Sequence, residues 1–183
     1  MRRALKFADI CTSVCDWAAR LAAVLMVLLV FIIMYDVIGS QFFAVGAVVL
    51  SDLQWHFHGV IALFSIGFAY TRNAHVRIDV LADRMNGRFR LWMEFWVLAL
   101  LVVPFALILL IYGFEFAERA YVRGEGAAGG RGLPHRWVIK SVIPASAVLI
   151  LLACVAVMIR IVAVLRRPDL IASPFLDRLL WKR

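Results

Sequence analysis

The chain alternates long apolar runs with short charged segments. Residues 21–51 form a 31-residue apolar region interrupted only by Asp36. Three further runs without Asp, Glu, Lys or Arg are 19, 20 and 19 residues long and cover residues 53–71, 95–114 and 141–159. About 20 apolar residues in a helix cross the hydrocarbon core of a bilayer. The pattern therefore predicts an all-α membrane protein with four transmembrane helices, at about residues 20–40, 52–72, 90–114 and 137–162.

The segments outside this 20–165 membrane domain have their own patterns. Residues 1–19 alternate charged and apolar groups at helical spacing, which predicts an amphipathic helix on the membrane surface. Residues 166–183 form a basic tail. The basic start is typical of a signal peptide, but about 20 residues precede the apolar run and no A-x-A site follows it. We therefore expect the first span to be retained.

Charge along the chain predicts its orientation in the membrane. The N-terminal tail, the 72–90 loop and the C-terminal tail together hold 15 Lys and Arg, whereas the 39–52 and 113–140 segments hold five. Because Lys and Arg are enriched on the cytoplasmic side, both termini are expected inside. Tryptophan and lysine near the span ends are expected to anchor the helices at the interface. These anchors are Trp17, Trp92, Trp96, Trp137 and Lys140.

Composition narrows the class of protein further. Hydrophobic residues make up 64% and charged residues 17%, against roughly 45–50% and about 25% in soluble domains. This excludes a soluble enzyme and a disordered chain. The net charge is +8. We interpret this basic excess as a determinant of membrane orientation and of contact with anionic lipid, and we expect no nucleic-acid partner.

Several local patterns predict details of the helices. Ser51-x-x-Gln54 has the pattern of a capping box that starts the second span. Pro104 and Pro144 lie inside the third and fourth spans, where each is expected to kink its helix. Residues 124–132 form a glycine-rich outer loop, and residues 75–80 alternate as in a short extended piece.

Candidate chemistry is sparse. His56 and His58 point about 200° apart on one helix, which does not suit a haem, and no zinc, nucleotide or nucleophile motif is present. The acids nearest to the spans are Asp36, Asp52 and Glu94, and none lies at a span centre. Cys11, Cys15 and Cys154 are interpreted as small buried hydrophobes. We therefore expect no enzyme activity and no cofactor, and a partner subunit is the default.

Two stretches of sequence together resemble a known family. One is Leu-Gln-Trp-His at 53–56 with Gly59 and the 69–80 run Ala-Tyr-Thr-Arg-Asn-Ala-His-Val-Arg-Ile-Asp-Val. The other is Gly-Glu-Gly at 124–126 with Gly-Leu-Pro-His-Arg-Trp-Val-Ile-Lys at 132–140 and Pro144. Both resemble the small membrane subunit of tripartite ATP-independent periplasmic (TRAP) transporters, over roughly residues 20–165.

That resemblance implies a complex in the bacterial inner membrane. A periplasmic binding protein captures an organic acid, and a large membrane subunit moves it, driven by a sodium gradient. The small subunit braces the large one in a stable 1:1 complex and helps the binding protein dock transiently. One departure concerns the segment before the second span, where many members carry paired acids and this chain has Asp52 alone.

The resemblance also leads to hypotheses about individual residues. The large-subunit interface is assigned to Asp36, Asp52, Trp55, His56, Gly59, Tyr70, His75, Arg77 and Asp79. Docking of the binding protein is assigned to Glu115, Glu118, Arg119, Arg123, Glu125, Arg131 and Arg136. The alternative for each charge is a solvated side chain. Two other functions stay open, namely the membrane anchor of a redox enzyme that binds quinone or haem, and a small exporter. The sequence does not name the transported substrate.

Overall fold

The computed structural model describes residues 1–43, 48–72, 87–126 and 132–166. Within these ranges the chain is helical, in the order α1 (Arg2–Phe43), α2 (Val48–Thr71), α4 (Gly87–Val97), the π-helical turn η1 (Leu98–Val102), α5 (Val103–Val122) and α6 (Trp137–Arg166). The predicted extended piece at 75–80 and the basic tail from 167 onward lie outside the described residues. The all-helical class is confirmed for the part of the chain that is described.

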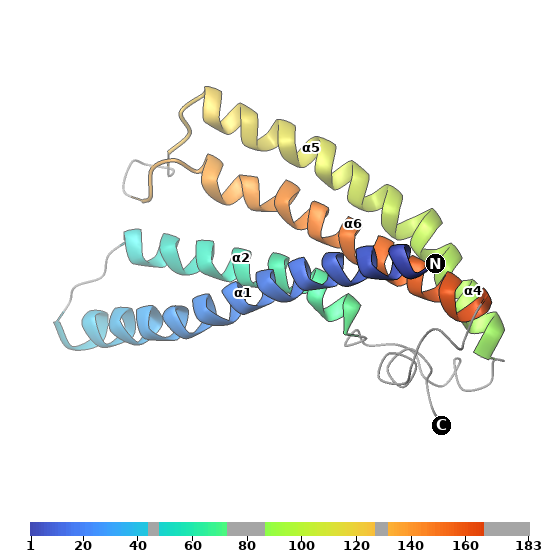
Figure 1. Ribbon diagram of the computed structural model, residues 1–183. Coiled ribbons are helices and arrows are strands. Elements are labelled where there is room, and N and C mark those ends of the chain that lie inside the picture. Colours follow the sequence, from blue (N-terminus) through green and yellow to red (C-terminus); the bar gives the residue numbers. More distant parts are fainter. Residues whose placement is uncertain (44–47, 73–86, 127–131, 167–183) are drawn as a thin grey trace.

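Two antiparallel helix pairs build the bundle, and α6 is its central element (Figure 1). The first pair is α1 with α2, and the second is α5 with α6. Helix α6 also contacts α1 and α2. Helix α6 contributes more buried residues to the core than any other helix does. Four of them, Ile150, Cys154, Val157 and Ile161, belong to one apolar cluster. The other helices are therefore positioned by their contacts with α6.

Two glycines bring neighbouring helices close to α6. A Cβ at Gly67 of α2 would lie 3.1 Å from the carbonyl oxygen of Leu149. A Cβ at Gly113 of α5 would lie 3.0 Å from Ile143 Cγ2 and 3.2 Å from the Pro144 ring. Small residues at these crossings let helix backbones approach, which is how helices associate in membranes where lipid is as apolar as a side chain.

Pro104 is accommodated by a change of hydrogen-bond register. A proline in a helix lacks an N–H and its ring meets the carbonyl of the preceding turn. Just before Pro104, the N–H of Val103 donates to the Leu98 oxygen, five residues back, and residues 98–102 form the π-helical turn η1. Local π turns are a known site of helix bending. The chain is thus helical from 87 to 122 with a wider turn beside Pro104, and the expected kink stays a prediction.

Helix α1 is longer than any single crossing needs. It has 42 residues, about 63 Å at 1.5 Å per residue, and it does not break between residues 1–19 and 20–40. Its first half has three stripes. Ala8, Cys11, Cys15 and Ala18 are buried, and Ala8 and Cys11 pack in one cluster with Ala156 of α6. A second stripe is apolar and exposed, and consists of Phe7, Ile10, Val14 and Trp17.

Charged residues form the third stripe of this segment, so its amphipathic pattern is preserved in three dimensions. The segment expected to lie on the membrane surface and the first predicted span belong to one continuous helix, α1. The exposed apolar stripe is the side that faces outward, and its contact with the membrane surface stays a prediction.

Three described helices are long and apolar enough to cross a membrane, namely residues 2–42, 88–122 and 137–166. Helix α2 has 24 residues, but Gln54, His56 and His58 lower the hydropathy of its first half. The fourth crossing and the orientation of the termini therefore stay predictions. The capping-box interpretation is wrong, because α2 begins at Val48 and Ser51 lies inside it.

Candidate functional site

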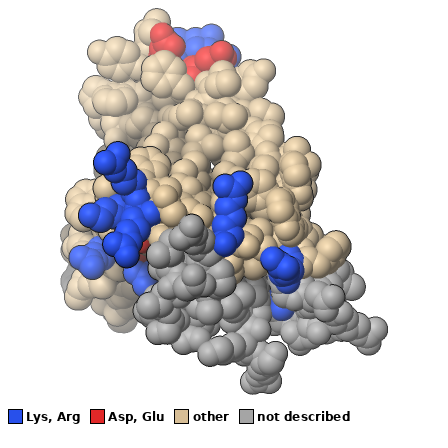
Figure 2. Space-filling model, turned by 45° about the vertical axis from the view of Figure 1, so that its right-hand side comes forward, with Lys and Arg blue, Asp and Glu red and all other residues tan. Residues whose placement is uncertain are grey.

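Charged side chains gather at the two ends of the bundle. At one end of the bundle lie the first residues of α1 and α4 and the last residues of α2 and α6. We call this the basic end, and we call the opposite end the loop end. Among the described residues, the basic end holds nine Lys and Arg against three acids, and the loop end four against four. Figure 2 shows this separation on one face, with an uncharged band between. The candidate sites are the two ends and the only acid between them in the described spans, Asp36.

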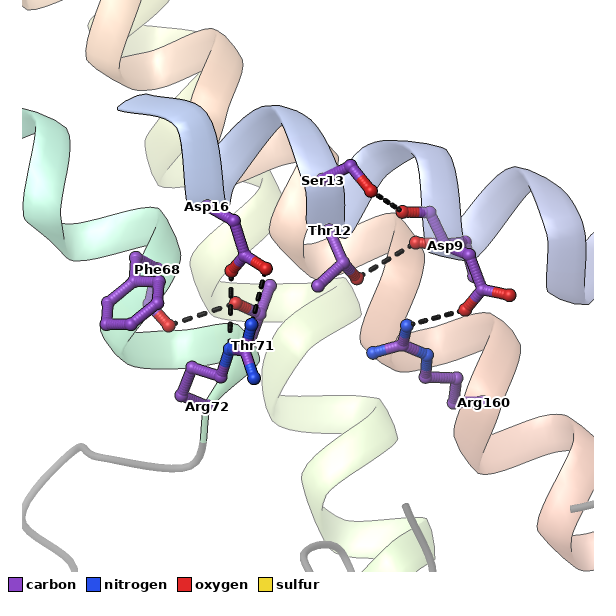
Figure 3. A network of polar contacts seen from close by, with 9 residues as sticks. Asp9, Thr12, Ser13, Asp16, Phe68, Thr71, Arg72 and Arg160 are labelled. Atoms are coloured by element: carbon purple, nitrogen blue, oxygen red, sulfur yellow. Dashed lines mark hydrogen bonds and ion pairs between the residues drawn. The ribbon is translucent and has the colours of Figure 1, made fainter. Parts of the chain in front are cut away.

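At the basic end, ion pairs join α1 to two other helices (Figure 3). Arg72, the residue after α2, holds Asp16 with two nitrogens, and its Nε donates to Asp16 Oδ1 at 3.2 Å. Arg160 of α6 donates from Nη2 to Asp9 Oδ1 at 2.9 Å. Arg160 is 8% exposed, so this cation is held inside the protein. Asp9 and Asp16 are seven residues apart, on one side of α1.

Helix α4 joins the same end through a tyrosine and a glutamate. The Tyr70 hydroxyl of α2 donates to Glu94 Oε1 of α4 at 3.3 Å, and Tyr70 packs against the main apolar cluster. Arg90 of α4 is buried, with 7% of its surface exposed. Buried Arg and Glu require partners to offset lost hydration. The basic end is thus a set of contacts between helices that are far apart in sequence.

At the loop end, the described residues of the connection between α5 and α6 make contacts with both helix pairs. Asp52 of α2 accepts a hydrogen bond from the backbone N–H of Leu133 at 3.1 Å. Glu125 pairs with Lys140 of α6, and the Glu125 carbonyl accepts the Arg136 N–H at 3.1 Å. The hydrogen bond from Lys140 holds the pKa of the Glu125 carboxyl below its ordinary value of 4.5.

Aromatic contacts complete the loop end. The rings of Tyr121 and Trp137 meet edge to face with centroids 5.5 Å apart. The Lys140 ammonium lies 3.9 Å from the centroid of the Phe116 ring, within the range of a cation–π contact. Trp137 and Lys140 therefore link α6 to α5 inside the chain. Their predicted role as membrane anchors stays a prediction, as it does for the exposed Trp17, Trp92 and Trp96.

A polar pair joins α1 and α2 nearer the loop end. Gln54 Nε2 donates to Asp36 Oδ2 at 2.9 Å. Beside this pair, a groove of about 260 Å³ is lined by Leu29 and Ile33 of α1 and by Gln54, Trp55 and His58 of α2. The Trp55 side chain is 72% exposed and meets His58 edge to face at 6.4 Å. Among the assigned interface residues in the described part of the chain, Trp55 is the large side chain that faces outward.

The other assigned interface residues that the structure describes make internal contacts. His56 Nδ1 lies 2.6 Å from the Asp52 carbonyl oxygen. Gly59 faces Ile139 of α6, whose Cδ1 would lie 3.4 Å from an added Cβ. His75, Arg77 and Asp79 lie outside the described residues. The interface assignment stays a prediction.

The assigned docking residues divide into exposed and half-buried groups. Glu115, Glu118, Arg119 and Arg123 are exposed on the last turns of α5 and just after it, and Arg119 lies 3.5 Å from Glu115. Glu125 and Arg136 are half-buried in the loop-end contacts. Arg131 lies outside the described residues. Docking by this group also stays a prediction.

Sequence reasoning missed the two ion pairs of the basic end and the partner of Asp36. Asp9 and Asp16 are seven residues apart in an otherwise basic segment, and this spacing could have indicated that both acids pair with basic residues of other helices. The three cysteines are buried as free thiols, which confirms their interpretation. Among the described residues, no group of three His, Cys, Asp or Glu could hold a metal ion.

Comparison with known proteins gives one match. Residues 29–164 match the family model described as "Tripartite ATP-independent periplasmic transporters, DctQ component". No curated protein and no solved structure matches the chain.

Proposed function

Since the chain belongs to the DctQ component family of tripartite ATP-independent periplasmic transporters, we propose that it braces a separate large carrier subunit and helps a periplasmic binding protein dock. The family is a transporter component rather than an enzyme. It also gives no support to the redox-anchor alternative. The transported solute is proposed to be an organic acid, carried by the large subunit with a sodium gradient.

The observation that carries the bracing role is the groove between α1 and α2. Leu29 and Ile33 of α1 give this groove an apolar side, and the Asp36–Gln54 pair lies beside it. A carboxylate in a membrane span is costly unless it is paired and faces protein. Polar side chains hydrogen-bond across helices in membranes, which a lipid chain cannot do. These features favour a helix of the large subunit as the occupant, with Trp55 as the aromatic side chain that it covers.

The loop end supports the docking role. Its base is fixed by the Asp52–Leu133 and Glu125–Lys140 contacts. Above this base the charges of α5 are exposed and of both signs. Exposed charges contribute mainly to association rate and to specificity, and their effect falls with salt. A transient partner is the kind of partner that such a surface suits.

The first experiment is co-purification of the tagged full chain from its native membranes in mild detergent. We expect a large polytopic membrane protein at equal stoichiometry. Trp55→Ala should lower the yield of that partner, because an exposed indole is a typical interface anchor. Trp17→Ala is the matched control, since Trp17 is similarly exposed, at 66%, but lies near the basic end.

Three results would contradict the bracing role. The first is a wild-type chain that purifies alone, and the second is a flavin or iron–sulfur subunit that accompanies it. The third is a Trp55→Ala variant that retains the partner as fully as Trp17→Ala does. A haem absorbance band in the purified protein would favour the redox anchor instead. For docking, the measured quantity is the affinity of the purified binding protein for the complex. It should fall as salt rises from low to physiological concentration.

A further inference from the structure

Two adjoining cavities run between α4 and α6 at the basic end. The first has a volume of about 410 Å³ and is lined by Arg88, Trp92, Val162, Leu165 and Arg166. The second has a volume of about 330 Å³ and is lined by Phe95, Val155, Met158, Ile159 and Val162, with Met1 and Ala4 of α1. Val162 lines both. The two cavities therefore adjoin at this residue, and we call them together the groove, which has a charged end and an apolar end.

Helical spacing places these side chains on facing ridges. On α4, Arg88, Trp92 and Phe95 are at positions i, i+4 and i+7, so they share one face. On α6, Val155, Met158, Ile159 and Val162 are at positions i, i+3, i+4 and i+7. Along α4 the order is arginine, tryptophan and phenylalanine, and along α6 it is arginine followed by apolar side chains. The groove thus changes from cationic to apolar in one direction.

The length and chemistry of this groove match one leaflet of a membrane. From Val155 to Arg166 the helix rises about 16 Å, and half of the hydrocarbon core is about 15 Å thick. Trp92 lies between the charged and the apolar parts, at the level where indoles prefer the membrane interface. Arg88 and Arg166 are exposed, and their guanidinium groups suit a phosphate.

We propose that this groove binds an anionic glycerophospholipid, with the phosphate between Arg88 and Arg166 and an acyl chain along Val162, Met158 and Val155. A partner helix of apolar residues would leave the two guanidinium groups without an anion. A free phosphate would leave the apolar half unfilled. A phospholipid satisfies both halves, and basic pockets between helices on the cytoplasmic side are known to bind such headgroups. The site stands independently of the transporter role.

The test measures lipid retained by the full chain, purified with whatever membrane partner accompanies it. Native mass spectrometry is used to titrate phosphatidylglycerol, phosphatidylethanolamine with the same acyl chains, and inorganic phosphate. We expect the wild-type protein to prefer phosphatidylglycerol. The Arg88→Ala/Arg166→Ala variant should weaken that binding at least about tenfold, whereas Arg88→Lys/Arg166→Lys should retain most of it. Arg119→Ala/Arg123→Ala, which removes two exposed arginines from the loop end, is the matched control and should bind as wild type does.

The apolar half is tested separately with Val162→Trp, which fills the groove where the two cavities join. It should reduce phosphatidylglycerol binding and leave any response to inorganic phosphate unchanged. All the substituted arginines are exposed. The unfolding temperature without added lipid should therefore be similar in the wild type, the alanine pair, the lysine pair and the loop-end control. The proposal is overturned if the alanine pair binds phosphatidylglycerol like the control, if phosphatidylethanolamine binds equally well, or if inorganic phosphate competes at the lipid's concentration.

Discussion

The basic end and the loop end use their charged residues differently. At the basic end, Asp9 and Asp16 of α1 pair with arginines that are 151 and 56 residues away in sequence. At the loop end, Arg119 pairs with Glu115 one turn away, and Glu125 pairs with Lys140 only 15 residues away. The first set of contacts joins three helices, whereas the second set mainly shapes one connection and leaves several charges exposed.

This difference indicates what each end contributes. Each basic-end pair has one buried or half-buried partner and joins distant helices, so these pairs fix the relative positions of α1, α2 and α6. Exposed charges on the last turns of α5 add little to stability, which leaves them available for the proposed docking of the binding protein. We therefore expect substitutions at the basic end to change folding, and substitutions of the exposed loop-end charges to change association.

The largest effect is expected from a glycine near the basic end. Gly67→Val places side-chain atoms against the Leu149 carbonyl, which is backbone of a packed helix and cannot move aside. Overpacking of this kind costs about 1–3 kcal/mol or more. The control is Gly126→Val at the loop end, where an added Cβ meets nothing within 4 Å. In detergent, the unfolding temperature should fall strongly for Gly67→Val and not for Gly126→Val. Equal falls in the two variants would contradict the difference between the two ends.

The helices of this fold could be predicted from the sequence, because their apolar runs are long and separated by charges. The packing around α6 could not be predicted, because Gly67 and Gly113 differ from other glycines only in what they meet across the bundle. The failure of the capping box at Ser51 has a related cause. Gln54 matches the motif locally, but its amide donates to Asp36 on the neighbouring helix. Of the candidate site, sequence indicated Asp36 and Trp55 but not how they are arranged.

A double-mutant cycle on Arg72 and Asp16 is expected to give the next largest effect. Their side chains are 37% and 20% exposed, and the contact is bidentate. We therefore expect a coupling free energy of about 1 kcal/mol. The same cycle on the exposed Glu115 and Arg119 pair should give about 0.3–0.5 kcal/mol. Unfolding free energies of the single and double alanine variants provide both values. A larger coupling at Glu115–Arg119 would reverse our ranking of the two ends.

A smaller effect is expected from acidification at the loop end. Because the pKa of Glu125 is lowered in the folded protein, its contribution to stability is present above the ordinary pKa of 4.5 and is lost as pH falls through the lower folded value. The unfolding temperature should therefore drop in this range by a few degrees at most. In Glu125→Gln this part of the drop should be absent. A variant that shows the full wild-type drop would mean that other acids account for it.

The smallest effect on stability is expected for Glu118, which is exposed on the outer turns of α5. Glu118→Ala should change the unfolding free energy by less than about 0.5 kcal/mol, whereas Asp16→Ala at the basic end should exceed that value because it removes the partner of Arg72. The same Glu118 variant should alter the salt dependence of association with the binding protein. If Glu118→Ala destabilised the protein as much as Asp16→Ala, the loop-end charges would be part of the fold rather than a surface for a partner. If it altered neither stability nor association, Glu118 would be a solvated charge, and docking would depend on the other exposed charges of α5.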